Sequence, residues 1–298
     1  TGDSGTINVN GAAAYSKIVR RSNNNNSKNN HIYFYGAGAY SNVLQQANGN
    51  IDFKGAGVAN VLTHNGTYGH TSFVGAGGAN IITHTAIGDI NFNGAGAANI
   101  IKHNGATGNT NFAGAGGANV IIHTANGEVS FNGAGIANVI FHKGNTGNAN
   151  INAGGALNLV VRQGNGNTNL TMAALGNVAV HLGNGNDRVF QLGGLNTYTR
   201  VGDGNTLLGL AGGLNVATLI GNGSVYGALL GAGNVVTKIG TGDSYIATIG
   251  TGNVVSQIDN SNNNSQTAAL MLGGTNILTK AGQGDLYGVM AGGLNVAT

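Results

Sequence analysis

The fold is decided by GAGGANIITH at residues 75–84, because close copies follow it at 94–103 (GAGAANIIKH) and 114–123 (GAGGANVIIH). Outward from these copies, the motif's Asn recurs along the whole chain at intervals of 18 to 23 residues, most of them 19 or 20. The recurring residues are Asn42, Asn60, Asn80, Asn99, Asn119, Asn138, Asn158, Asn177, Asn196, Asn215, Asn234, Asn253, Asn276 and Asn295. A degenerate first copy carries Lys17 in the Asn position, which gives fifteen copies. A fixed period of this kind indicates a repeat architecture.

Each repeat unit is too short for two packed helices. It holds two short strands with a turn after each, one made by the apolar residues after the Asn and one by alternation such as Ile51-Asp52-Phe53. Strung together, these units predict an all-β fold, a parallel β-solenoid of about fifteen 19–20-residue coils. In such a fold each coil buries its apolar residues only by stacking on its neighbours.

The composition agrees with this architecture and excludes several others. The 298 residues include 56 Gly but no Pro, Cys or Trp, and only 7% are charged, against roughly 25% in a typical soluble domain. The glycines exclude a helical protein, the lack of Pro excludes collagen, and the lack of Cys excludes disulfides and thiolate metal sites. We expect no transmembrane helix and no signal peptide, and because the sequence begins with Thr we expect it to be part of a longer protein.

Two repeat subtypes divide the chain without a linker. Residues 1–150 carry the GAGxAN motif and contain an Asn-rich stretch at 21–30, whereas residues 151–298 carry GGLN or GxGN and contain a second such stretch at 259–267. We interpret both stretches as surface loops inserted between coils, and the two parts as one continuous rod. The strand edges of the terminal coils should pair with other chains, so end-to-end dimers or filaments are expected.

Stacked coils place equivalent residues in columns. The recurrent Asn from Asn60 to Asn253 is expected to form a structural ladder of side-chain amides. A second column predicts a core stack of aromatic rings: Phe34, Phe53, Phe73, Phe92, Phe112 and Phe131. Two adjacent apolar columns begin at Val61 and Leu62, and neighbours in a strand point to opposite faces. One column must fill the core and the other faces outward unless the chain bends, and the sequence leaves open which.

A basic column is the strongest functional candidate. The position four residues after the Asn holds His64, His84, His103, His123, His142, Arg162, His181 and Arg200, followed after a break by Lys238 and Lys280. One interpretation is a solvated polar face. The other is a surface that becomes cationic as His protonates between pH 5 and 7, although stacking of like charges should depress those pKa values.

Other chemistry is sparse. We find no catalytic constellation and expect no enzyme activity and no cofactor. Asp187, Asp243 and Asp285 match the tail of the calcium-binding nonapeptide repeat, which makes them weak calcium candidates. Because calcium sites of that type need Asp in successive nine-residue turns, we interpret the three as turn residues.

The repeats at 75–84 and at 234–243 (NVVTKIGTGD) resemble the glycine-rich repeats of MARTX toxins, the multifunctional autoprocessing repeats-in-toxin family. The resemblance implies a non-catalytic region of a bacterial toxin that is secreted by the type I route. It implies contact with, or assembly at, the host membrane, which would help effector domains to cross. The implied partners are the host membrane or a membrane receptor, neighbouring repeats of the same toxin and a second copy of the chain, with no nucleic acid.

Two alternatives belong to other classes. The chain could be the passive stalk of a bacterial surface adhesin or matrix protein, which would ignore membranes. An ice-binding solenoid would show a flat face of Thr ladders, but the Thr column here is broken.

Overall fold

The computed structural model describes residues 5–21, 30–259 and 264–298, so most of the predicted loop at 21–30 and residues 260–263 of the loop at 259–267 lie outside the described residues. The regular elements of the described residues are all β-strands. The chain forms two compact units, Thr1–Ala153 and Gly154–Thr298. The strand β9 (Ala149–Gln163) contains the boundary between them.

Parallel strands build the N-terminal unit. They are β1 (Gly5–Ala12), β2 (Tyr15–Arg20), β3 (Asn30–Gln45), β4 (Ile51–His64), β5 (Thr71–His84), β6 (Ile90–His103), β7 (Thr110–His123) and β8 (Val129–His142). Those from β4 to β8 are 14 residues long. From β3 onward each pairs in parallel with the next, in a register that aligns like with like: Phe53 pairs with Phe73, Asn60 with Asn80 and His64 with His84. Paired residues are therefore one repeat apart, and the predicted parallel β-solenoid is confirmed.

The C-terminal unit repeats the same arrangement. Its strands are β10 (Thr168–Leu182), β11 (Asp187–Val201), β12 (Thr206–Ile220), β13 (Val225–Ile239), β14 (Ser244–Ile258), β15 (Thr267–Ala281), β16 (Leu286–Ala291) and β17 (Leu294–Ala297). Asn196 pairs with Asn215 and Leu195 with Leu214, again in parallel.

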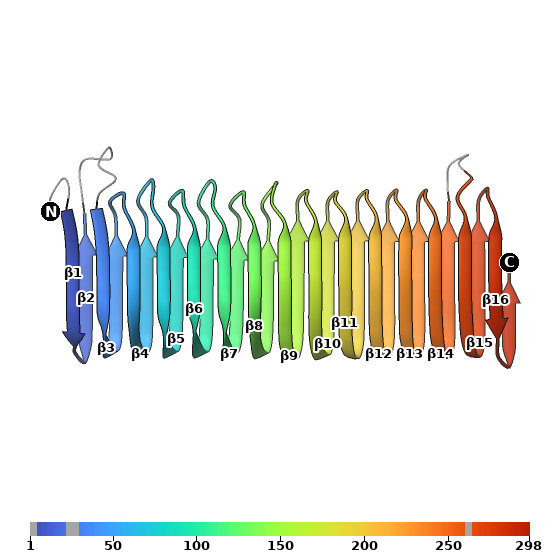
Figure 1. Cartoon of the computed structure of the whole chain (residues 1–298), viewed down its shortest axis with the longest axis horizontal. Coiled ribbons are helices and arrows are strands. Elements are labelled where there is room, and N and C mark those ends of the chain that lie inside the picture. The colour runs from blue at the N-terminus through green and yellow to red at the C-terminus, as the bar shows by residue number, and fades with distance from the viewer. Residues whose placement is uncertain (1–4, 22–29, 260–263) are drawn as a thin grey trace. The chain divides into compact units, whose positions relative to one another are not determined.

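Each coil from β3 to β15 contains one long strand that bends, rather than the two separate strands expected from the sequence; the first and last coils have two separate strands, β1 with β2 and β16 with β17. Figure 1 shows the long strands turning back on themselves near their middle. The bend requires Gly for lack of room: a Cβ on Gly94 would lie 2.3 Å from the carbonyl oxygen of Gly75. The opposite turn requires Gly for its conformation, since Gly202 and Gly204 have φ values of 138° and 130°.

The core lies between the two halves of each bent strand. In the N-terminal unit the Phe rings stack with centroids 4.7–5.1 Å apart and interplanar angles of 2–7°. The apolar column that begins at Leu62 is buried with them, and the column that begins at Val61 faces outward. The question left open by the sequence is thus answered: the residue directly after the Asn points out and the next one points in.

The Asn side chains lie in this core and form a ladder. In the N-terminal unit the Nδ2 of Asn99 donates to the Oδ1 of Asn119 at 2.8 Å, and Asn119 donates onward to Asn138 at 2.8 Å. The same Nδ2 also donates to a bend carbonyl, at 3.1 Å from Asn119 to Ala134. In the C-terminal unit the equivalent bonds run from Asn158 to Asn276 at 2.8–2.9 Å.

Replacing Asn119 with Ala should destabilise the N-terminal unit by about 1–3 kcal/mol for each buried group that loses its partner. The amide of Asn99 loses its acceptor, and the carbonyl of Ala134 loses its donor. Urea unfolding followed by circular dichroism measures the change. Asn93→Ala, on the outward face of β6, is the matched control and should change stability by less than about 0.5 kcal/mol. Equal losses for both variants would contradict the ladder.

Candidate functional site

The basic column predicted as a surface stripe is buried, so that prediction is wrong. His64, His84, His103, His123 and His142 in the N-terminal unit are 0% exposed, and Arg162, His181, Arg200 and Lys238 in the C-terminal unit are 0–2% exposed. The reason is the alternation of the strand: Asn60, Leu62 and His64 are two residues apart and share the inward face. The column cannot act as a cationic surface, nor is it a solvated polar face.

Threonine hydroxyls hold the histidines of the N-terminal unit in pairs. The Oγ1 of Thr71 lies 3.3 Å from the Nδ1 of His64 and 2.9 Å from the Nδ1 of His84. Thr110 stands in the same relation to the next pair, His103 and His123, at 3.0 and 2.8 Å. Sequence reasoning missed these threonines, whose signal is an alternation of Ile and Thr along one column: Ile51, Thr71, Ile90 and Thr110.

Burial keeps these imidazoles neutral. Neighbouring rings meet edge to face, with centroids 4.8–5.0 Å apart. Removal from water lowers the pKa of His84 to about 3 and the pKa of His64, His103 and His123 to about 4. Repulsion between neighbouring imidazoles is the second cause for His84, His103 and His123. The protonation between pH 5 and 7 that the sequence predicted therefore does not occur at these four imidazoles in the folded chain.

In the C-terminal unit the basic side chains satisfy turn carbonyls from inside the coil. The guanidinium of Arg200 donates to the carbonyl oxygens of Gly185, Asp203, Gly204 and Asn205. The ammonium of Lys238 donates to Thr241 and Gly242, both at 2.6 Å, and burial lowers its pKa to about 8. These cations stabilise the turns and do not reach the surface.

Asp187 is the buried acid of this network. Its carboxylate lies 2.9 Å from the Nδ1 of His181 and 3.4 Å from the Nε of Arg200, and it accepts a hydrogen bond from the hydroxyl of Tyr198. Burial raises the pKa of Tyr198, followed by the charge of Asp187, so the phenol remains a donor. Asp187 is committed to these partners and is not a turn residue in solvent.

The other two calcium candidates lie at turns. Asp243 accepts the backbone N–H of Gln266 at 2.8 Å, and Asp285 accepts the hydroxyl of Tyr287 at 3.1 Å. Within the described ranges, no group of three or more His, Cys, Asp or Glu residues could hold a metal ion.

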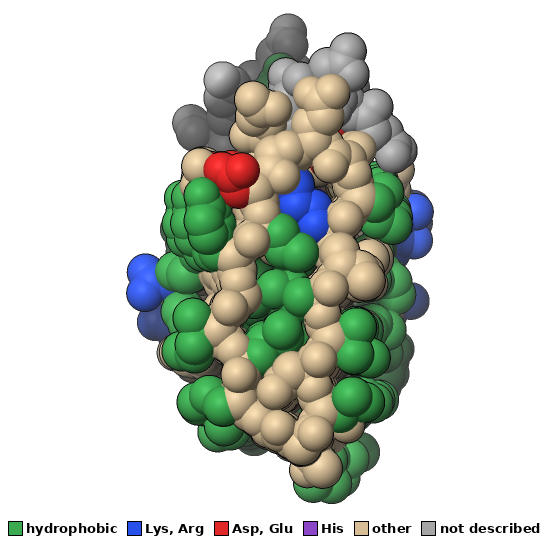
Figure 2. All heavy atoms as spheres, turned by 90° about the vertical axis from the view of Figure 1, so that its right-hand side faces the viewer, with side chains coloured by type: hydrophobic (Ala, Val, Ile, Leu, Met, Phe, Trp, Pro, Cys, Tyr) green, Lys and Arg blue, Asp and Glu red, His purple; other side chains and the backbone are tan. Residues whose placement is uncertain are grey.

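Two outward columns of the C-terminal unit are apolar. One outward column of β11–β14 contains Leu192, Leu230 and Ile249, which are 61%, 50% and 50% exposed, with the small Ala211 between the first two. A second column lies on the outward face of the other half-strands and contains Leu182, Val201, Ile220, Ile239 and Ile258. Figure 2, which looks onto the last turn, shows hydrophobic side chains along both outer flanks as well as between the strands.

Charge is correspondingly scarce. Residues 154–298 contain five basic and five acidic residues, which gives a net charge of zero (5 − 5). Arg188 is the exposed one of these five basic residues. Arg162, Arg200 and Lys238 are buried, and Lys280 is half-buried. The outward face of the first half-strands in the N-terminal unit is instead polar, with Asp52, Ser72, Asn91, Asn111 and Ser130 in one column.

Fold and surface together define a repeat protein of the parallel β-solenoid class, in which like residues align in columns. Eight stretches match the RtxA repeat: 55–69, 75–91, 94–111, 114–129, 133–150, 172–187, 230–246 and 271–286. These matches support an RTX-type repeat protein. Proteins with such repeats are typically secreted, and the repeat solenoid is a structural fold. Comparison with curated proteins and with solved structures found no match.

Proposed function

We propose that this chain is a non-catalytic repeat region of a secreted MARTX-type toxin, and that it contacts the host membrane through the outward apolar columns of its C-terminal unit. The observation that carries the proposal is the column of Leu192, Leu230 and Ile249, half or more exposed in consecutive and near-consecutive coils. Contact of this kind would hold the toxin at the host cell surface while effector domains cross.

Apolar contact with a membrane is favourable for this unit, because its outward columns are apolar and its net charge is zero. Contiguous exposed apolar patches mark membrane or protein contact sites. Each Å² of apolar surface removed from water contributes about 25 cal/mol. Since the unit has no net charge (5 − 5 = 0), binding should depend little on salt, unlike the electrostatic attraction expected from a basic stripe. The described residues contain no helix that could cross a membrane.

Replacing Leu192, Leu230 and Ile249 together with Thr should abolish most vesicle binding. Thr keeps the β propensity of these outward positions and removes the apolar surface. At about 1 kcal/mol for each half-exposed side chain, the three changes should weaken partitioning about a hundredfold. Cosedimentation with phosphatidylcholine vesicles at 0.1 and 0.5 M salt measures this.

The matched control replaces three outward apolar residues of the N-terminal unit, Val58, Val74 and Ile136, with Thr. This variant should bind vesicles like the parent. If the parent itself ignores vesicles, the passive-stalk alternative is favoured. Equal losses in the two triple variants would show that the C-terminal columns have no special role.

A further inference from the structure

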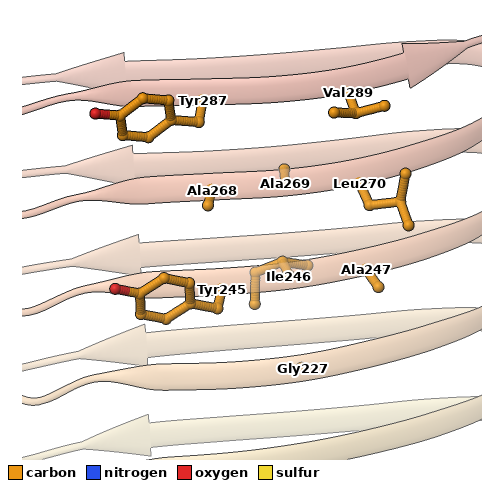
Figure 3. A pocket seen from close by; sticks show the side chains of 9 residues that line it. All are labelled: Gly227, Tyr245, Ile246, Ala247, Ala268, Ala269, Leu270, Tyr287 and Val289. Atoms are coloured by element: carbon orange, nitrogen blue, oxygen red, sulfur yellow. The ribbon is translucent and has the colours of Figure 1, made fainter.

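An outward tyrosine column of the C-terminal unit has one ring missing. Register aligns Tyr226 with Tyr245, Tyr245 with Ala268 and Ala268 with Tyr287. The first two rings stack with centroids 5.3 Å apart and planes 10° apart. At the third position Ala268 supplies no ring, which leaves a hollow of about 410 Å³ between Tyr245 and Tyr287 (Figure 3).

The hollow has the width of one small group. Adjacent parallel strands are about 4.8 Å apart, so the rings of Tyr245 and Tyr287, two coils apart, lie roughly 10 Å from each other. Its floor is apolar and is made by Ile246, Ala268 and Ala269. A group centred between the two rings would be about 5 Å from each, inside the roughly 6 Å range over which a cation is attracted to an aromatic face.

Two carboxylates flank one end of the hollow. The hydroxyl of Tyr245 lies 3.5 Å from Asp243 and that of Tyr287 donates to Asp285 at 3.1 Å. Among the described residues that line the hollow there is no Lys or Arg. The exposed cation on the same face, Arg188, is three coils away and lies 5.2 Å over the ring of Phe190, so a cation–aromatic contact already exists on this face.

We propose that this hollow binds a quaternary ammonium group, as found in choline and in the headgroup of phosphatidylcholine. The methyl groups would pack on the two rings and the alanine floor, and the positive charge would be stabilised by the ring faces and by Asp243 and Asp285. A primary ammonium centred between the rings fits less well, because N–H donors that point at the ring faces and the apolar floor, away from the two carboxylates, would lose their hydration without a hydrogen bond. The ammonium site does not depend on the proposed function. Only its assignment to a lipid headgroup rests on the proposed membrane contact.

Calorimetric titration of the full chain with choline chloride tests the site, with ethanolamine as the comparator. We expect a dissociation constant in the millimolar range for choline and binding at least tenfold weaker for ethanolamine. Ala268→Tyr should abolish choline binding by completing the ring column, and Tyr287→Leu should weaken it about tenfold. Tyr226→Leu, in the same column but outside the hollow, is the control and should bind like the parent. Choline binding that survives Ala268→Tyr, or equal binding of ethanolamine, would overturn the site.

Vesicle-binding measurements distinguish the ammonium site from the proposed membrane contact. The Leu192, Leu230 and Ile249 triple variant should lose vesicle binding but still bind free choline. Ala268→Tyr should still bind vesicles but lose any preference for phosphatidylcholine over phosphatidylethanolamine vesicles. If the parent binds free choline without such a preference, the ammonium site stands and the lipid headgroup is excluded as its source.

Discussion

Acidification from pH 7 to pH 5 should remove on the order of 8 kcal/mol of stability from the N-terminal unit. The buried imidazoles of His64, His84, His103 and His123 have pKa values of about 3 to 4 in the folded chain, whereas an unfolded His titrates near 6.5. Below pH 6.5 the unfolded state therefore binds more protons than the folded state, and stability falls with pH until the folded values are reached. At 1.36 kcal/mol per pH unit, each His loses about 2 kcal/mol by pH 5.

Native-state hydrogen exchange, resolved by peptide and corrected for the intrinsic effect of pH, measures this loss. Peptides of β4–β7 should lose protection at pH 5. Peptides of β11–β14 serve as the internal control, because those strands contain no His. Uniform loss of protection in both units would contradict the role of the histidines.

A His→Gln variant at the same four positions should flatten the pH dependence. The column itself shows that Gln fits: Gln257 occupies the equivalent place in β14, is 1% exposed and donates to the carbonyl of Gly242 at 3.0 Å. An unchanged pH profile in this variant would place the acid sensitivity elsewhere.

The sequence predicted the solenoid because the repeat period directly gives the register in which neighbouring coils pair. Residues 19 or 20 apart must pair when each coil stacks on the next, and the columns of Asn and Phe follow directly. The sequence-based interpretation of the His column was wrong because it took polar residues as outward residues. Strand alternation offers a better rule: once Leu62 is inward, Asn60 and His64 are inward as well.

The hydrogen-bonding partners of the buried Asn and His side chains could not be predicted from the repeat motif alone. Burying an amide or an imidazole costs free energy unless it is hydrogen-bonded. The Asn ladder supplies its own partners, one coil to the next. The histidines depend on Thr71 and Thr110. Each Thr contacts the His of its own strand across the bend at Gly and the His of the preceding strand across the turn. The position of that bend, where the inward phase shifts by one residue, was not evident from composition or spacing.

Asp187→Ala should destabilise the C-terminal unit by about 3–5 kcal/mol, because it breaks a buried ion pair by removing one partner. The carboxylate is the acidic partner of both His181 and Arg200, and it accepts from Tyr198. Its removal leaves a guanidinium 1% exposed without a counter-charge, and such a charge cannot recover its hydration without opening the coil.

The neighbouring coils suggest a substitution that should recover part of the stability lost in Asp187→Ala. Asp187 stands in a column between Thr168 and Thr206, so Asp187→Thr restores the local shape and one hydrogen-bonding oxygen but not the charge. We expect it to recover part of the loss, and Asp285→Ala, at an exposed turn, to cost less than about 0.5 kcal/mol. Urea unfolding at pH 7 ranks the three variants. If Asp187→Thr is as stable as the parent, packing alone holds the column together, and the buried charge pair serves to fix which residues meet in the core rather than to stabilise it.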